Sequence, residues 1–398
     1  MTTLSVVIPA YNEQDGIADI AQRVLAVRDA LVNVGVKGLE LLVVDDGSGD
    51  KTAAIASDIE GVTLIQHERN KGYGAALKTG FHAAQGDLIG FLDADGTYPP
   101  ENFPELCVAA MNGSDIVIGS RMAGANSQMP ITRRIGNLFF ANLLSLLGRQ
   151  SVSDSASGMR VFKRDVLEVV SPLPDGLNLT PVMSTRAVHE QVAIKEIPIP
   201  YSERVGRSKL SVVRDGKLFL SSMVWTALTY NPMRVLGLVG LACLTLASLV
   251  GLGLVTARLS GVTTLDAWGV SALYAAMVSA VIGISLTSLG AMFNYLVRFF
   301  HTRPIKQGFF GRSPLNNKAD RHFGWIGGLT LVVGIAVAIA SMTLGISGWA
   351  IERIWLYLLG SAMLILIGVQ LIIGWIVMRV LDDLSKRSID ARANAHNN

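Results

Sequence analysis

Four long apolar stretches in the second half of the chain restrict its fold more than any other feature. They cover residues 233–256, 270–297, 323–345 and 354–380. No charged residue lies at the centre of any of them, and a helix that spans a bilayer needs about 20 apolar residues. The chain is 50% hydrophobic and only 16% charged, whereas soluble domains are about 25% charged. We therefore predict a four-helix transmembrane domain at residues 231–381, followed by a cytoplasmic tail at 382–398.

The charges that flank these stretches predict the orientation of the chain. The connection at 298–322 carries six basic residues against Asp320, and the tail contains Lys386, Arg387 and Arg392. Because cytoplasmic loops of membrane proteins are enriched in Lys and Arg, we expect both segments in the cytoplasm. Four spans then place the first half of the chain there as well. The sequence thus predicts a multi-pass protein of the plasma or inner membrane.

Residues 1–230 alternate between strand-like and helix-like segments. Strands are expected at 4–9, 39–44, 62–65, 88–92 and 115–119, and helices at 14–31, 50–59 and 74–84. Continuously apolar strands separated by helices are typical of a mostly parallel, Rossmann-like α/β sheet covered on both faces. Ligands of such sheets bind at the carboxyl ends of the strands. The residues that follow the strand ends, and so converge on one edge, are Tyr11, Asp45, Asp46, Asp93 and Asp95.

Asp93-Ala94-Asp95 at the end of a buried strand is the most informative motif. Two carboxylate charges held this close repel each other unless a cation lies between them. A hard divalent cation prefers oxygen ligands and could also hold a diphosphate. The alternative is an ordinary turn, because Asp, Gly and Pro all favour turns.

Two amphipathic segments, 134–149 and 209–230, are predicted to lie at the membrane interface. Arginines at the start of the first segment, and the continuation of the second into a membrane span, favour this placement over helices that face a protein core. The apolar stripe of the first comprises Ile135, Leu138, Phe139, Leu143, Leu146 and Leu147. That of the second comprises Val212, Phe219, Met223, Val224 and Leu228.

Composition excludes several other kinds of site. Cys107 and Cys243 are the only cysteines, so neither a disulfide framework nor a zinc site is supported. The net charge is only +3, and the basic residues cluster near the apolar stretches. We therefore expect phosphates and lipid headgroups as anionic partners, and no nucleic acid. The spacing of Gly72, Gly74 and Gly80 fits no phosphate-binding motif and favours a tight strand-to-helix connection.

Four motifs occur in order in the first half: VIPAYNE (7–13), VVDDGSGDKT (43–52), NKGYGAAL (70–77) and DAD (93–95). This pattern resembles the family 2 glycosyltransferases, which have a GT-A fold. Further motifs are similar to those of the polyprenyl-phosphate glycosyltransferases, such as the dolichol-phosphate mannose synthases. They are DADGTYPPE (93–101), GSR (119–121), DSASGMR (154–160) and RVGRSKL (204–210). The resemblance extends to about residue 300, and the Gln-x-x-Arg-Trp signature of processive synthases is absent from the sequence.

The resemblance implies a role for each matching residue. The nucleotide-sugar pocket would contain Pro9, Tyr11, Glu13, Asp45, Asp46 and Asp93. Asp93 and Asp95 would hold Mg²⁺ or Mn²⁺. The lipid phosphate would be bound by Arg121, Arg133, Arg134, Arg204, Ser208 and Lys209. The residues expected to be catalytic are Asp93, Asp95, Arg121 and Arg204. For Asp154, catalysis and anchoring of a loop are both open.

We therefore predict an inverting, metal-dependent enzyme that glycosylates a polyprenyl phosphate, either dolichyl or undecaprenyl, at the cytoplasmic face. The donor would be a nucleotide-diphosphate sugar of the GDP-mannose or UDP-glucose type. The alternative is a flippase or transporter-like protein whose first domain only binds nucleotide-sugar. The membrane stretches carry few polar and no charged residues at mid-span, which disfavours a path for a charged headgroup. The sequence leaves homo-oligomerisation open.

Overall fold

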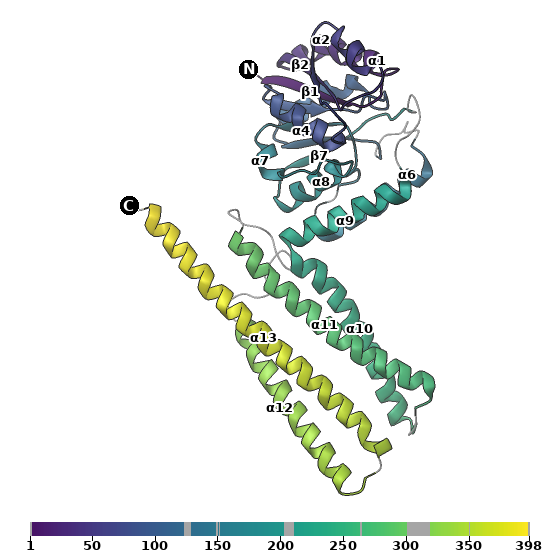
Figure 1. Ribbon diagram of the computed structural model, residues 1–398, viewed down its shortest axis with the longest axis vertical. Helices are drawn as coiled ribbons and strands as arrows, with labels where there is room; N and C mark the ends of the chain where they lie inside the picture. The colour runs from purple at the N-terminus through teal and green to yellow at the C-terminus, as the bar shows by residue number, and fades with distance from the viewer. Residues whose placement is uncertain are drawn as a thin grey trace. The chain divides into compact units, whose positions relative to one another are not determined.

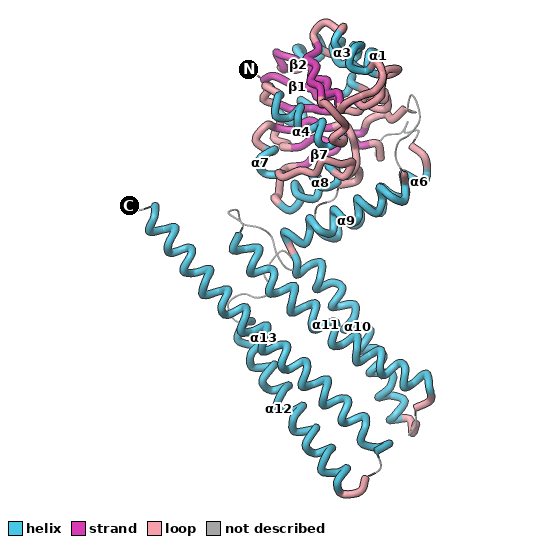
Figure 2. Tube along the Cα trace, in the orientation of Figure 1, coloured by secondary structure: helices cyan, strands magenta, loops and turns pink. Residues whose placement is uncertain are grey.

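The computed structural model describes residues 2–122, 129–148, 150, 152–202, 211–262, 265–300, 319–349 and 351–396. The chain divides into two compact units, Met1–Ala227 and Leu228–Asn398. The first unit is an α/β domain, and the second contains only helices and their connections in the part that is described (Figures 1 and 2).

A single mixed sheet of seven strands forms the centre of the first unit, as far as its residues are described. The strands are β1 Thr2–Ala10, β2 Val36–Asp45, β3 Val62–Gln66, β4 Leu88–Phe91, β5 Ile116–Ser120, β6 Arg160–Lys163 and β7 Ile194–Pro198. Their order is β3-β2-β1-β4-β6-β5-β7. All pairs are parallel except those of β6, which runs antiparallel to both β4 and β5. The predicted mostly parallel sheet is confirmed, but β6 and β7 were not predicted.

Helices cover both faces of this sheet because successive strand residues point to opposite sides. Val6 and Ile8 belong to the core on one face, whereas Val7 belongs to the core on the other. The first face packs against α1 Ile17–Ala26, α2 Arg28–Asn33, α3 Thr52–Ser57 and α5 Phe103–Met111. The second packs against α4 Tyr73–Ala83, α6 Ile131–Gly148, α7 Val166–Val170, α8 Leu179–His189 and α9 Val212–Tyr230. A short 3₁₀ helix, η1 Pro100–Asn102, precedes α5. The helix predicted at 14–31 is divided at Val27 into α1 and α2.

The two amphipathic segments bury part of their predicted apolar stripes and leave part of them exposed. In α6, Leu144 and Leu147 are buried in the core, while Ile135 and Leu138 are exposed. In α9, Met223 is buried and the Phe219 ring packs on Phe140 of α6, with centroids 5.9 Å apart. The predicted stripe of α9 thus faces the core in part. The apolar side chains exposed on α9 are Val213, Leu218, Leu220 and Trp225.

The second unit consists of two helical hairpins. The helices are α10 Pro232–Leu259, α11 Ala267–Phe300, α12 Ala319–Ile346 and α13 Ile351–His396. They contain the four spans Pro232–Ala257, Ala267–Asn294, Phe323–Ile346 and Ile354–Leu381, so the predicted membrane helices are confirmed. Helix α10 packs on α11 and α12 packs on α13. The Ser285 hydroxyl of α11 donates to Gln370 Oε1 of α13 at 3.0 Å, which connects the two hairpins.

Candidate active site

The loops that follow β1 and β2 are tied together by short polar contacts. The Asn12 amide nitrogen donates to Ser48 Oγ at 2.9 Å, and the Gly49 amide donates to Asn12 Oδ1 at 2.9 Å. The Glu13 amide donates to Thr52 Oγ1, also at 2.9 Å. Asn12 has a φ of 52°, a left-handed conformation that asparagine tolerates better than most residues. These contacts hold Tyr11 and Glu13, which were predicted to bind the nucleotide-sugar, at the carboxyl edge of the sheet.

Pro9 lies in β1, where a proline is usually excluded because it cannot donate to a neighbouring strand. It is buried and aligned with Val44 of β2. On the other side of β1, the pairing with β4 ends at Val7 and Phe91. Pro9 therefore lies past the end of β4, where no ladder bond to that strand is required.

Asp45 and Asp46 are adjacent and buried, but their carboxylates have different surroundings. Asp46 accepts three hydrogen bonds: from His67 Nδ1 at 2.7 Å, from the Lys71 amide at 2.8 Å and from the Gly72 amide at 2.8 Å. Asp45 Oδ2 accepts from the Ser48 amide at 3.3 Å, whereas its buried Oδ1 has no partner among the described residues. Asp46 thus anchors the loop before α4, and Asp45 Oδ1 can accept a hydrogen bond from a ligand.

The glycines near the start of α4 allow close packing. Gly72 has a φ of 107°, and a Cβ there would lie 2.5 Å from the carbonyl oxygen of Asp175. A Cβ on Gly74 would lie 2.2 Å from the carbonyl oxygen of Pro174. Both positions require glycine for steric reasons, as expected of a tight strand-to-helix connection.

Asp93 and Asp95 lie in the loop directly after β4. The Tyr73 hydroxyl donates to Asp93 Oδ1 at 2.8 Å, and Thr97 donates to Asp95 Oδ1 through its amide at 3.1 Å and its hydroxyl at 2.6 Å. Burial, together with the Asp93 carboxylate, raises the pKa of Tyr73 well above its usual value. A Cβ on Gly158 would lie 2.5 Å from Asp93 Oδ2, so only glycine leaves room for that oxygen.

Asp93 and Asp95 could contribute to a divalent-cation site only if a substrate supplied further ligands. No group of three or more His, Cys, Asp or Glu side chains that could hold a metal is present in the described part of the chain. Mg²⁺ commonly binds through one or two carboxylates, substrate phosphates and water rather than in an all-protein cage. Asp93 and Asp95 would supply the protein's share of such a site.

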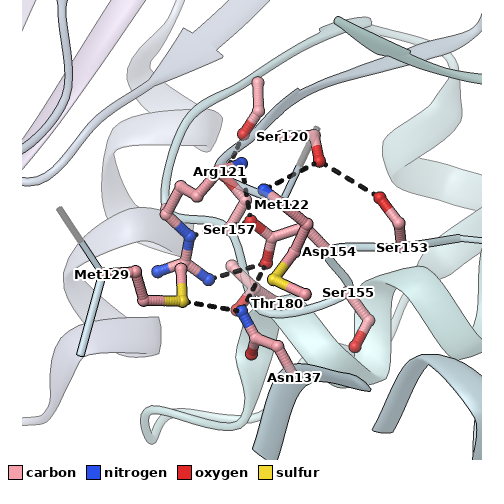
Figure 3. A network of polar contacts seen from close by, with 12 residues as sticks. Ser120, Arg121, Met122, Met129, Asn137, Ser153, Asp154, Ser155, Ser157 and Thr180 are labelled. Carbon is pink, nitrogen blue, oxygen red and sulfur yellow. Dashed lines mark hydrogen bonds and ion pairs between the residues drawn. The ribbon is translucent and has the colours of Figure 1, made fainter. Parts of the chain in front are cut away.

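Arg121 and Asp154 form an ion pair beside this loop (Figure 3). Arg121 Nε donates to Asp154 Oδ2 at 2.8 Å and Nη2 donates to Oδ1 at 2.6 Å, while the Arg121 amide also donates to Oδ2 at 2.9 Å. Asn137 Nδ2 of α6 donates to Oδ1 at 3.2 Å. The Asp154 side chain is fully buried and that of Arg121 is 12% exposed. Sequence reasoning selected Arg121 and Asp154 separately but did not predict their pairing.

Two aromatic rings flank the Arg121 guanidinium. Its Cζ lies 5.8 Å from the centroid of Tyr98 and 5.5 Å from that of Tyr201. Burial alone would lower the pKa of Arg121, but the Asp154 carboxylate and the side chains of Tyr98 and Tyr201 together outweigh burial and hold this pKa well above its usual value. The cation is therefore permanent, fixed in direction and partly screened by its own carboxylate.

Arg160 of β6 donates hydrogen bonds to the loop that carries Asp154. Its Nη2 donates to the carbonyl oxygens of Ser155 at 2.7 Å and Thr180 at 3.2 Å, and its Nε donates to that of Ser157 at 3.2 Å. The side chain is fully buried, and burial lowers the pKa of Arg160 to about 10. Arg160 therefore ties the loop that carries Asp154 to α8.

The remaining predicted phosphate ligands are placed only in part. Arg133 is half-buried and Arg134 is exposed, both in the first turn of α6. Arg204, Ser208 and Lys209 lie outside the described residues.

Comparison with known proteins identifies the family of the chain. Residues 5–171 match the family described as "Glycosyl transferase family 2", and residues 232–392 match "Domain of unknown function (DUF8752)". The chain is 31% identical over 313 residues to the undecaprenyl-phosphate 4-deoxy-4-formamido-L-arabinose transferase of Klebsiella pneumoniae. That alignment covers 77% of this chain and 92% of the relative. The chain belongs to glycosyltransferase family 2.

Two relatives from Haloferax volcanii extend the comparison. The family 2 chain is 35% identical over 252 residues to the low-salt glycan biosynthesis hexosyltransferase Agl6, an alignment that covers 62% of this chain and 59% of that relative. It is 32% identical over 221 residues to the dolichyl-phosphate hexose transferase, which covers 56% of this chain and 92% of that relative. The chain is thus a glycosyltransferase, as predicted, with a GT-A domain followed by four helices of membrane-spanning length.

Among solved structures, one similar chain is the glucosyl-3-phosphoglycerate synthase of Mycobacterium tuberculosis in complex with Mn²⁺, UDP and glucosyl-3-phosphoglycerate. Its identity to this family 2 chain is 21%, with a TM-score of 0.44, and the match covers 57% of this chain and 80% of that one.

Proposed function

We propose that this glycosyltransferase moves a sugar from a nucleotide-diphosphate donor to a polyprenyl phosphate at the cytoplasmic face of a membrane, with inversion and with a divalent cation. The observation that carries the donor site is the buried Asp45 Oδ1, which has no partner among the described residues at the carboxyl edge of the sheet. A buried acceptor of this kind is costly unless a ligand donates to it. A base or ribose group of a nucleotide provides such donors.

The acceptor is proposed from the relatives and from the membrane helices together. Two relatives are named for transfer that involves undecaprenyl phosphate or dolichyl phosphate. An acceptor with a polyprenyl chain stays in the bilayer, and four helices of this chain are long enough to span one. The Arg121 guanidinium supports a phosphate group nearby: Asp154 takes its Nε and one N–H of Nη2, and the N–H groups that remain on Nη1 and Nη2 could donate to phosphate oxygens.

The proposed reaction needs little acid–base chemistry from the protein. The phosphate monoester of the acceptor is largely ionised near neutral pH, so it is already a nucleophile. One of its oxygens forms a bond to the anomeric carbon while the bond from that carbon to the diphosphate oxygen breaks, and the nucleoside diphosphate leaves. A cation held by Asp93 and Asp95 would supply neutralisation of the diphosphate charge. Arg121 would orient the acceptor phosphate and reduce the repulsion between two anionic substrates.

The test is transfer of radiolabelled sugar from a panel of nucleotide-sugars to undecaprenyl phosphate or dolichyl phosphate in nanodiscs. Arg121→Ala and Arg204→Ala should each lower the efficiency for the lipid acceptor roughly a hundredfold, while calorimetry shows near-normal donor affinity. Arg23→Ala serves as the matched control, because Arg23 is paired with Glu101 at the exposed surface of α1. No transfer to either lipid with any donor would contradict the proposed function. Loss of donor binding in both variants, with an unchanged response to acceptor, would mean that the two phosphate sites are assigned in reverse.

A further inference from the structure

Glu196 of β7 binds the loop that carries Asp154. It belongs to no motif in the sequence and was not predicted as a site residue. Its Oε1 accepts from the Asp154 amide at 2.8 Å and from the Ser153 hydroxyl at 3.0 Å. Its Oε2 accepts from the Ser153 amide at 2.9 Å. A single carboxylate thus holds two successive backbone amides and the hydroxyl between them.

The same contacts continue to the end of β5. Ser153 Oγ lies 3.1 Å from Ser120 Oγ, and Ser120 directly precedes Arg121 (Figure 3). Since the Ser153 hydroxyl donates to Glu196, the consistent arrangement has the Ser120 hydroxyl donating to Ser153 Oγ. Both residues of the Arg121–Asp154 pair are therefore connected, through Ser153 and Ser120, to the carboxylate of Glu196.

We infer that Glu196 is a positioning residue for the acceptor phosphate, acting through Asp154 on the direction of the Arg121 guanidinium. Asp154 binds Arg121 through both of its oxygens, so a shift of the Asp154 backbone turns the guanidinium with it. The N–H groups on Nη1 and Nη2 that Asp154 leaves open would lose their alignment with phosphate oxygens when the guanidinium is rotated. This inference rests on the proposed function, because it assigns to Arg121 the acceptor phosphate.

A purely structural role for Glu196 is the alternative, and the chain offers a matched control for it. Glu40 of β2 is also half-buried and also holds a serine hydroxyl and a backbone amide: Ser5 Oγ and the Gln85 amide donate to its Oε2. These contacts join β1 to the residues before β4, near the amino ends of those strands and thus at the opposite edge from Arg121. A general weakening of the sheet should follow when the contacts of either carboxylate are removed, whereas an effect on acceptor recognition should follow only from the change at Glu196.

The experiment compares Glu196→Gln and Glu40→Ala in the full-length protein in nanodiscs. Glutamine at 196 has nearly the same shape as glutamate, but both Glu196 oxygens accept from backbone amides, so its amide group would face a backbone N–H and one hydrogen bond is lost. Both contacts of Glu40 use one oxygen, which a glutamine could replace, so alanine is needed there to remove them. We expect Glu196→Gln to raise the KM for undecaprenyl phosphate about tenfold, with donor affinity unchanged by calorimetry. Glu40→Ala should leave both quantities unchanged at equal amounts of folded protein. Ser153→Ala, which removes only the hydroxyl, should raise the acceptor KM by a smaller factor and carries the test if Glu196→Gln does not fold.

The outcomes separate this inference from the proposed function. Suppose that the wild-type protein transfers sugar to the lipid, but the acceptor KM of Glu196→Gln, or that of Ser153→Ala in its place, matches that of Glu40→Ala. The positioning role is then wrong and the proposed function stands. The positioning role would also be overturned if Glu196→Gln lost donor affinity by the same factor as its acceptor KM rises. If the wild-type protein transfers no sugar to a polyprenyl phosphate, the proposed function fails, and the inference built on it fails too.

Discussion

At the scale of single residues, the site shows how two adjacent carboxylates acquire different roles. Asp45 and Asp46 are equally buried, and the sequence assigns both to the nucleotide pocket. Asp46 accepts hydrogen bonds from His67 and from two backbone amides, whereas Asp45 keeps an oxygen that has no hydrogen-bond partner among the described residues. We therefore expect Asp45→Asn and Asp46→Asn to have different effects.

Asp46→Asn should destabilise the first unit. The new amide group would face at least one of the three donors that Asp46 now accepts from, and a buried unmatched donor costs about 1–3 kcal/mol. For a unit of this size each kcal/mol lowers the melting temperature by about 2–4 °C, so we expect a fall of roughly 2–12 °C, measured by circular dichroism in detergent. A melting temperature equal to that of wild type would show that Asp46 does not anchor the loop before α4.

Asp45→Asn should instead weaken donor binding. Its amide group must face either the Ser48 amide or the ligand donor, so one of these two contacts is lost. We expect the affinity for the nucleotide-sugar to fall about tenfold or more, with a smaller change in melting temperature than for Asp46→Asn. Calorimetry with the donor identified in the transfer assay measures this. Wild-type affinity in this variant would place the nucleotide elsewhere.

Asp95→Ala and removal of divalent cations should each abolish transfer while the protein stays folded. The proposed cation depends on the pair Asp93 and Asp95, since no larger group of ligands is present in the described part of the chain. Activity lost in EDTA should return on addition of Mg²⁺ or Mn²⁺, and Asp95→Ala should show no such recovery. Full activity of wild-type protein in excess EDTA would rule out the metal role.

At the scale of elements, the apolar pattern of the sequence predicted the strands that have a clear local signal. Strands β1 to β5 were predicted because each is an apolar run that ends in a turn. The short strands β6, Arg160–Lys163, and β7, Ile194–Pro198, contain only two or three apolar residues each and show no apolar alternation, so they give no reliable signal. The pairing of Arg121 with Asp154 depends on β6 lying antiparallel to β5. That is a non-local fact, so the two residues could be found singly but not as a pair.

Helix packing in the membrane unit offers a test at this scale. A Cβ on Gly368 of α13 would lie 2.6 Å from the Leu331 nitrogen of α12, whereas one on Gly360 of α13 would meet nothing within 4 Å. Close approach through small residues is a main source of helix association in lipid. Gly368→Val should therefore lower the thermal stability of the detergent-solubilised protein, and Gly360→Val should leave it nearly unchanged. Equal effects of the two would mean that the α12–α13 contact does not depend on Gly368.

At the scale of the whole molecule, the chain combines a domain that resembles other family 2 enzymes with a membrane unit that matches a family of unknown function. Helix α13 continues past its span, from Leu381 to His396. We propose that this extension is the cytoplasmic tail that the sequence predicts. The proposed reaction requires that the first unit be on the side where nucleotide-sugars are made, and this requirement links the topology to the function.

The distribution of basic residues makes that topology testable. Six Lys or Arg residues lie at 298–322, between α11 and α12, whereas the turn around Gly261, between α10 and α11, is nearly free of charge. Because basic loops are retained in the cytoplasm, a reporter fused after Asn398 or inserted near Gly311 should be cytoplasmic, and one near Gly261 should be external. A cytoplasmic reporter at Gly261 would show that the hairpin of α10 and α11 does not cross the membrane as predicted. An external reporter at Asn398 would leave an odd number of crossings between the two ends of the chain, and with a cytoplasmic first unit that is incompatible with four spans.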